Sequence, residues 1–203
     1  MRDSAVRSRQ SVQMMLVLVF FGLVLQAGGA LRGAIPRAER EALIALYEQA
    51  GGPGWVNRSN WRTPDDTAFG EPGTECTWFG VYCDPDGAHV IGLYLLSNNL
   101  DGTFPPELAA LTHLQWLDLS SNHLRGKIPP GLDALAGLTT LSLGFNELSG
   151  PIPRQLGNLT GLTLLNLTFN ELTGPIPPEL GQLEHLQSLN LGYNRQEGPI
   201  PPE

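Results

Sequence analysis

The chain of 203 residues is poor in cysteine, with two residues, and poor in charge, with only 16% of its side chains charged. A zinc site would need further cysteine or histidine ligands near such a pair, and the sequence around the cysteines supplies none. Basic side chains are outnumbered by acidic ones, 12 against 20, and no basic stripe is present that could release counterions from a phosphate backbone. These shortages exclude a cysteine-based zinc site and nucleic-acid partners.

Motifs of common enzymes are absent as well. The sequence contains no GxSxG elbow, no glycine-rich phosphate loop and no HExxH pair. The histidines His113 and His185 occupy the same position of a repeat three turns apart, which is roughly 14 Å at about 4.8 Å per strand, so they cannot share a metal. We therefore expect no catalytic residue, no metal site and no cofactor.

The first thirty residues have the pattern of a targeting segment. A basic start is followed by the apolar residues 14–25 and by the small residues 27–30. An apolar core of 12 residues is short for a membrane span, which needs about 20. The pattern predicts a signal peptide over residues 1–30, with an uncleaved anchor over residues 12–30 as the alternative. Either places the remaining chain outside the cytosol, where the even pair Cys76 and Cys83 is expected to form a disulfide.

The second half of the chain repeats itself with a constant period of 24 residues. An asparagine marks the register of each copy, and these asparagines are Asn98, Asn122, Asn146, Asn170 and Asn194. Each copy has the frame LxxLxxLxLxxNxLxGxIPxxL, which resembles the leucine-rich repeat in its plant-type form. The resemblance implies an α/β repeat solenoid, a right-handed coil with a concave parallel β-sheet, and assigns about five repeats to residues 89–203.

Residue types explain the frame. In LxL the two leucines point inward and the residue between them points outward, as in a strand. The asparagine tolerates tight turns and its amide can pair backbone groups inside the coil. The glycine permits unusual backbone angles, and the proline suits the edge of an element. Segments such as residues 178–183 are then expected to return as short helical stretches on the convex side.

Residues 31–88 precede the repeats and are predicted to form an N-terminal cap of a helix and a hairpin. Apolar positions at helical spacing begin after Pro36 and end before Gly51, which predicts a capping helix. Trp55 and Trp61 are expected in the core of the cap. Residues 84–87 fit a hairpin turn better than a calcium loop, because further oxygen ligands at set spacing are missing.

The segment CTWFGVYC resembles the CxWxGVxC signature in the cap of plant-type leucine-rich-repeat receptors and inhibitor proteins. The match covers Cys76, Trp78, Gly80, Val81 and Cys83, and it implies a disulfide between the two cysteines. At the other end, the fifth repeat stops three residues short and no C-terminal cap follows. Solenoid ends normally require caps, so we expect a truncated product or a fragment of a longer protein.

Outward positions of the predicted sheet vary while the frame stays constant, as expected if the frame holds the coil and the face meets a partner. Aromatic residues are favoured anchors at interfaces, which makes Trp116 and Tyr94 the first candidates, followed by Asp118 and Phe145. The complete predicted ligand-binding face is Tyr94, Trp116, Asp118, Ser142, Phe145, Asn166, Phe169, Asn190 and Tyr193. The aromatic residues that directly precede an asparagine have an alternative role as packed structural side chains.

Three sequons for N-glycosylation occur, at Asn57, Asn158 and Asn166. The predicted position of Asn158 is the convex return, whereas a glycan on Asn166 would cover part of the proposed binding face.

The leading functional hypothesis is a non-catalytic, secreted or cell-surface recognition module that binds a protein, peptide or glycan. The resemblance implies a receptor-like protein in signalling or defence, linked to a membrane only through an uncleaved anchor or a segment outside this chain. The resemblance also implies a second hypothesis, a secreted inhibitor of polysaccharide-degrading enzymes, as some plant-type leucine-rich-repeat proteins are. An acidic face would suit this role, because it would steer basic enzymes. A structural component of the cell wall or matrix is the third.

Overall fold

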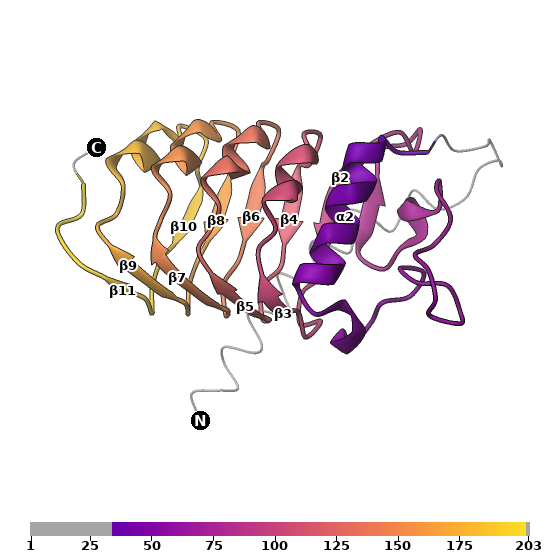
Figure 1. Cartoon of the computed structure of the whole chain (residues 1–203). Helices are drawn as coiled ribbons and strands as arrows, with labels where there is room; N and C mark the ends of the chain where they lie inside the picture. Colours follow the sequence, from indigo (N-terminus) through magenta and orange to yellow (C-terminus); the bar gives the residue numbers. More distant parts are fainter. Residues whose placement is uncertain (1–33, 202–203) are drawn as a thin grey trace, which may run out of the picture. The chain divides into compact units, whose positions relative to one another are not determined.

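A computed structural model describes residues 34–201, and the predicted targeting segment lies outside the described residues. In that described part of the chain, no helix has both the length and the apolar character needed to cross a membrane. The described elements form one coil of repeats with the capping helix at its N-terminal end (Figure 1).

The predicted capping helix is α2, which spans Arg37–Gln49. Pro36 is the residue directly before the first helical residue. Proline is tolerated there because its missing N–H is not needed for a hydrogen bond within the helix. Leu43 and Leu46 are fully buried against the repeats, as their helical spacing predicts. The helix ends at Gln49 with Ala50 as its C-cap residue, and Gly51 follows with a φ of 70°, in the left-handed region that glycine adopts at low cost.

One sheet carries the strands that were predicted from the LxL pattern. Its order is β1-β2-β4-β6-β8-β10, with β1 antiparallel to β2 and the other neighbours parallel. Its strands are β1 Val81–Cys83, β2 Val90–Tyr94, β4 Trp116–Asp118, β6 Thr140–Ser142, β8 Leu164–Asn166 and β10 Ser188–Asn190. The structure thus confirms the predicted parallel sheet and the predicted hairpin of the cap.

A second parallel sheet runs along the coil, in the order β11-β9-β7-β5-β3, and was not predicted from the sequence (Figure 1). Its strands are β3 Asp101–Thr103, β5 His123–Gly126, β7 Glu147–Pro151, β9 Glu171–Gly174 and β11 Arg195–Gln196. Strands β5, β7 and β9 include a glycine of the frame, and these residues, Gly126, Gly150 and Gly174, have φ of 83°, 78° and 75°. The left-handed glycine turns the chain out of this short sheet toward the proline that follows.

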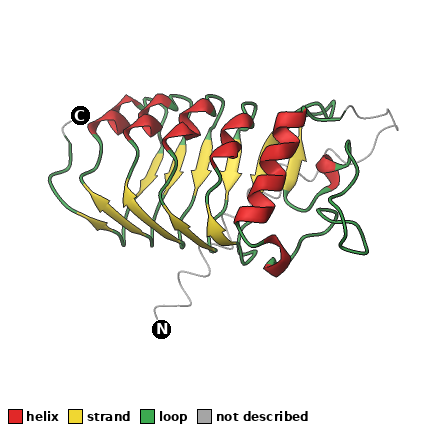
Figure 2. Cartoon of the chain, viewed as in Figure 1, coloured by secondary structure: helices red, strands yellow, loops and turns green. Residues whose placement is uncertain are grey.

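The return segments are short 3₁₀ helices (Figure 2). In the repeats they start after an extended proline, which presets φ for the turn and needs no N–H partner. Those of the repeats are η3 Pro106–Ala110, η4 Pro130–Ala134, η5 Arg154–Asn158 and η6 Pro178–Gln182, and those of the cap are η1 Gly52–Gly54 and η2 Glu75–Thr77. The predicted helical return after Pro177 is confirmed as a single 3₁₀ segment.

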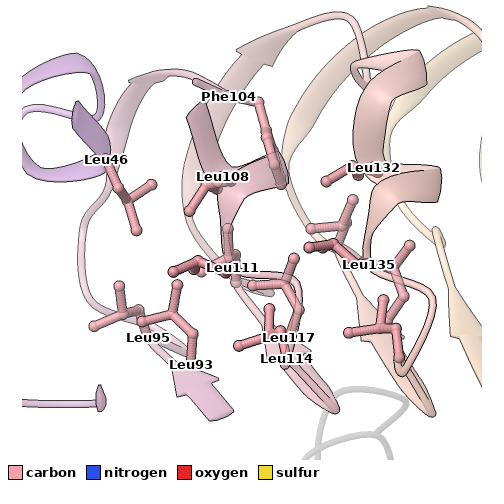
Figure 3. Packing of buried hydrophobic residues seen from close by; sticks show 14 of the residues in the cluster. Leu46, Leu93, Leu95, Phe104, Leu108, Leu111, Leu114, Leu117, Leu132 and Leu135 are labelled. Carbon is pink, nitrogen blue, oxygen red and sulfur yellow. The ribbon is translucent and has the colours of Figure 1, made fainter. Parts of the chain in front are cut away.

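The hydrophobic core is a stack of leucine layers between the sheets and the 3₁₀ segments (Figure 3). Leu93, Leu117 and Leu141 repeat at the same position and are fully buried. Leu46 of α2 packs into the same core near the first turn, so the helix covers the layer that would otherwise face water (Figure 3). Burial of each such leucine contributes about 2 kcal/mol of hydrophobic stabilisation.

The recurring asparagine forms a ladder inside the coil. The Oδ1 atom of Asn122 accepts hydrogen bonds from the backbone N–H groups of Asn98 and Leu100 at 3.0 and 2.9 Å. Its Nδ2 atom donates to the carbonyls of Leu95 and Leu119 at 2.8 and 2.9 Å. One amide therefore pairs backbone groups of two successive turns, which confirms its predicted structural role.

Candidate functional site

The register of the first sheet brings the predicted face residues into rows. Asp118 pairs with Ser142, Ser142 with Asn166, and Asn166 with Asn190. We call these four residues the polar row. Tyr94 pairs with Asp118 and stands at the head of the row. The 24-residue period thus places side by side the residues that it predicted to be neighbours.

An aromatic platform of Tyr82, Tyr94 and Trp116 lies at the cap end of the sheet. The rings of Tyr82 and Tyr94 meet edge to face with centroids 5.3 Å apart. All three close over Gly92, where an added Cβ atom would lie 3.2 Å from Tyr94, 3.3 Å from Tyr82 and 3.7 Å from Trp116. A side chain at Gly92 would push the rings apart, so the missing Cβ gives the platform its closeness.

Tyr82 was missed by the sequence analysis. It lies on β1, whose antiparallel pairing places Tyr82 opposite Gly92 and extends the sheet by one strand beyond the repeats. The sequence VYC after the cap glycine could have predicted this position. In a strand, neighbouring side chains point to opposite faces, so Tyr82 points outward next to the buried Val81.

Asp118 is the charged group of the polar row. Its Oδ1 atom accepts hydrogen bonds from the N–H and the hydroxyl of Ser120, at 3.0 and 2.5 Å. Burial raises the pKa of Asp118 above the ordinary value, and the hydroxyl and backbone hydrogen bonds only partly oppose this. Burial also raises the pKa of Tyr94, with the nearby Asp118 charge adding to the effect. Within residues 34–201 no cationic side chain forms an ion pair with Asp118.

Asn166 repeats the hydrogen bonding of Asp118 two turns further on, without the charge. Its Oδ1 atom accepts from the N–H and the hydroxyl of Thr168, at 3.1 and 2.7 Å. Its Nδ2 atom donates weakly to the hydroxyl of Ser142 at 3.4 Å. In the next turn Nδ2 of Asn190 donates to the hydroxyl of Ser188 at 3.0 Å. The row therefore offers both donors and acceptors along the sheet.

Phe145, Phe169 and Tyr193 form an aromatic ladder at the end of strands β6, β8 and β10. Successive rings stack with centroids 4.4 and 4.0 Å apart and planes 16° and 10° from parallel. Their exposure grows along the ladder, from half-buried Phe145 to 39% for Phe169 and 75% for Tyr193. The rings pack on one another and still present apolar surface to solvent, so packing and binding are compatible here.

The residues of the aromatic ladder also have a left-handed backbone, as Ser97 and Ser121 do at the same position of the first two repeats. Phe145, Phe169 and Tyr193 have φ of 57°, 52° and 57°, a left-handed conformation that bulky side chains rarely adopt. Backbone hydrogen bonds hold Phe145 there, since its N–H donates to Thr168 at 2.8 Å and its carbonyl accepts from Asn122 at 3.1 Å. The tight turn was expected at the asparagine, whereas the left-handed residue lies one position earlier.

The predicted sequons lie in three different settings. Asn158 is exposed in η5, and its Nδ2 atom donates to Asp133 at 3.0 Å. Asn57 is half-buried in the cap, with its Oδ1 atom accepting from the N–H of Ser59 at 3.0 Å. Asn166 is half-buried within the polar row. Glycosylation at these three positions stays a prediction.

Known proteins share both the repeat and the coil. Two family models match, one described as Leucine rich repeat over residues 136–195 and one as Leucine Rich Repeat over residues 113–135. The BIR2 ectodomain from Arabidopsis thaliana is 33% identical with a TM-score of 0.72, and the similarity covers 83% of this chain and 85% of that one. The chain is a plant-type leucine-rich-repeat protein.

Two further similarities involve longer proteins. A probable leucine-rich-repeat receptor-like serine/threonine-protein kinase of Arabidopsis thaliana is 41% identical over 81 residues, which are 40% of this chain and 10% of the kinase. The leucine-rich-repeat ectodomain of the plant membrane receptor kinase GASSHO1/SCHENGEN3 from the same organism, in complex with CASPARIAN STRIP INTEGRITY FACTOR 2, is 34% identical. Its TM-score is 0.61, and the similarity covers 80% of this chain and 22% of that one. This leucine-rich-repeat protein thus spans only a small part of the kinase and receptor chains that it matches.

One group of possible metal ligands was also missed by the sequence analysis. In the described part of this leucine-rich-repeat protein, Glu39, His89 and His113 offer ligand atoms that all lie within 4.8 Å of one another. From the sequence, His113 was compared only with the distant His185. His89 lies one period of 24 residues before His113 and was not compared with it.

Proposed function

We propose that the chain is a non-catalytic recognition module that binds an extended peptide or protein segment on the sheet β1-β2-β4-β6-β8-β10. The observation that carries the proposal is the polar row and its aromatic surroundings. The aromatic platform lies at the cap end of this row, and the aromatic ladder lies along one edge of it. The frame residues on the inner side are buried leucines, so the outward residues are free to vary without loss of the core.

The chemistry of the face suits a polypeptide ligand. A peptide backbone has alternating N–H and C=O groups, and the hydroxyl and amide groups of Ser142, Asn166 and Asn190 supply partners for both. The half-buried rings of Tyr94 and Trp116 offer apolar area at low entropic cost. The Asp118 carboxylate, which burial makes costly to ionise, favours a ligand that brings a lysine or arginine beside it.

The similar proteins support this direction. The GASSHO1/SCHENGEN3 ectodomain was solved in complex with a named factor, and the BIR2 structure is likewise an ectodomain. By analogy we place this chain outside the cell, as a secreted or cell-surface protein with a receptor-like role in signalling or defence. The analogy supplies the class of partner, whereas the named face residues decide which ligand is bound.

The test uses a displayed library of random peptides, selected on the full chain and read out as affinities of the recovered peptides. We expect Trp116→Ala to weaken them by at least about 30-fold, the change that corresponds to about 2 kcal/mol for an interface anchor. The double variant Tyr94→Ala with Trp116→Ala should abolish capture. Lys127→Ala, an exposed change outside the proposed face, is the control and should bind as the parent does. Equal affinity of parent and double variant, with unchanged circular dichroism, would overturn the proposal.

A second arm addresses inhibition of polysaccharide-degrading enzymes, the function class implied by the resemblance to plant-type inhibitor proteins and compatible with the acidic composition. The full chain is added to a panel of basic secreted hydrolases, and residual activity is measured with and without the Asp118→Asn change. Inhibition that survives both Trp116→Ala and Asp118→Asn would assign the inhibitory surface elsewhere. Binding on a glycan array in place of peptide capture would redirect the proposal to carbohydrate ligands.

A further inference from the structure

His89 and His113 form a stacked pair at the junction of the cap and the repeats. They are one 24-residue period apart, so they occupy the same position in adjacent turns. Their ring centroids are 3.6 Å apart and their planes are 20° from parallel. His89 directly precedes β2, and its side chain is 32% exposed, against 52% for His113. Both imidazoles are therefore accessible from solvent.

Glu39 of the capping helix faces this pair from the protein side. Its side chain is only 3% exposed. The Oε2 atom accepts a hydrogen bond from the backbone N–H of Val90 at 2.8 Å, which fixes the carboxylate. The Oε1 atom lies 2.7 Å from Nδ1 of His89 and 3.7 Å from Nδ1 of His113. One carboxylate oxygen is thus aimed at both imidazoles.

Packing alone does not account for this arrangement. A single hydrogen bond to His89 would satisfy Oε1, yet a second imidazole is stacked beside the first with its Nδ1 atom turned to the same oxygen. Two protonated rings at 3.6 Å would repel each other. One divalent cation can neutralise the buried carboxylate and accept a lone pair from each neutral ring.

We propose that Glu39, His89 and His113 bind one zinc ion, with water in the remaining coordination position. Two imidazole nitrogens and one carboxylate oxygen form a ligand set typical of zinc, whereas calcium and magnesium prefer oxygen ligands. Zinc bonds of about 2.0–2.1 Å in tetrahedral geometry separate neighbouring ligand atoms by about 3.3 Å. The observed separations of 2.7 and 3.7 Å lie on either side of that value.

Binding requires one small movement. A shared ion must lie near the plane of each ring, so the nearly parallel rings have to rotate relative to each other. His113 can do this, because its side chain is half-exposed and the contact of its Nδ1 atom with the Thr112 hydroxyl, at 3.5 Å, is weak. The ion would join α2 to the first two turns of the repeat coil. We therefore expect zinc to stabilise the contact between the cap and the repeats.

The experiment titrates zinc into the full chain, previously treated with chelator, and measures heat of binding and thermal unfolding. One ion should bind per chain and raise the midpoint of unfolding. Cobalt(II) should give the visible absorption bands of a four-coordinate site at the same stoichiometry. His113→Gln should weaken zinc affinity by at least about 100-fold, since loss even of a group that only orients a ligand costs 10–100-fold.

The matched control is His185→Gln, which removes an exposed histidine from the same position of a repeat three turns away. It should leave zinc affinity unchanged. Glu39→Gln, which keeps an oxygen for the Val90 N–H, should also abolish tight binding. Absence of zinc binding by the parent, or an equal loss in His113→Gln and His185→Gln, would overturn the proposal. Peptide capture by the sheet face is a separate readout that these outcomes do not affect.

Discussion

The cap and the repeats are stabilised by different kinds of contact. The cap core gathers large aromatic rings, and Trp61 packs against Trp55 and Trp78 with centroids 5.0 and 4.9 Å apart. The repeat core is built from leucines and an asparagine ladder that recurs from turn to turn. Each cap contact occurs once, whereas each repeat contact has copies in the neighbouring turns. Losses should therefore be local and specific in the cap, and graded by position in the repeats.

The largest effect is expected from the buried ion pair of the cap. Arg40 donates to Glu75, whose side chain is 1% exposed, and to the carbonyl of Gly70 at 2.6 Å. Arg40→Met would leave the Glu75 carboxylate buried without its cation, and we expect a loss of about 3–5 kcal/mol in the free energy of unfolding. The measurement is urea unfolding followed by tryptophan fluorescence, since the cap rings report on this region.

The control for this change is Arg37→Met, which removes the exposed i,i+4 pair with Glu41 on the same helix. Solvent screens such an exposed pair, so its loss should be small beside the loss of the buried pair. If both methionine variants lost the same stability, burial would not be the property that makes the cap contacts specific.

The stability lost when an asparagine of the asparagine ladder is removed should depend on its position along the repeats. Asn146 lies in the middle, and Asn146→Ala would leave the Leu124 N–H buried without its acceptor and would remove one of the two amide donors to the Leu119 carbonyl. An unpaired buried N–H costs about 1–3 kcal/mol, and together with the lost hydrogen bond to the carbonyl we expect a loss of about 2–4 kcal/mol. Asn194→Ala removes the same kind of contact where the amide is only part-buried, and water can replace it. Equal losses at the two positions in chemical denaturation would contradict this gradient.

The disulfide is a contact of the cap alone. Cys76 and Cys83 are bonded and close a loop with a sequence separation of 7. Replacing both by serine should cost about 2–3 kcal/mol, mainly because the unfolded chain gains freedom. Hydrogen exchange should speed up in β1 and η2 while strands β6 and β8 keep their protection. Two free thiols in non-reducing mass spectrometry of the parent, or uniform loss of protection, would contradict the assignment.

The smallest effect on the free energy of unfolding is expected from changing Asp118. Asn166, which makes the same hydrogen bonds without a charge, is the residue to compare it with. The raised pKa means that the folded state holds the Asp118 proton more tightly than the unfolded chain does. This contribution to stability is complete below the ordinary aspartate pKa and is lost as the pH rises through the folded value. Asp118→Asn keeps the acceptor for Ser120 and carries no charge, as Asn166 does beside Thr168.

We therefore expect Asp118→Asn to gain stability relative to the parent as the pH rises from acid to neutral. Urea unfolding of both proteins at a series of pH values measures this difference directly. A constant difference across the series would contradict the raised pKa. Asn190→Ala, an uncharged change at the far end of the same row, controls for effects of the variant on packing.

Much of the fold could be predicted because a constant period turns distance along the chain into translation along the coil. Leu117 and Leu141 are 24 residues apart, and strand pairing places them directly opposite each other. The capping helix, the buried Trp61 and the bonded cysteines follow from local patterns in the same way. In these regions the nearest neighbours in space are set by spacing in the sequence.

The second sheet and the left-handed turns could not be predicted by that reasoning. Strands such as β5 and β9 are short and contain glycine, so their composition resembles a loop, and only pairing with the next turn makes them strands. Phe145 has no local preference for a left-handed backbone, and it adopts one because both of its backbone groups are bonded to neighbouring turns. Contacts between turns override local preference at these positions.

The sequence by itself determined the repeat register, the inward leucines, the asparagine ladder and the rows of outward residues, because all of these depend on a period that every copy shares. Tertiary structure decided what the single-copy cap adds to that pattern. It placed Tyr82 beside Tyr94, and it brought Glu39 against His89 and His113. The angle at which α2 packs on the first turns has no repeat to predict it, so only long-range packing could assemble these groups.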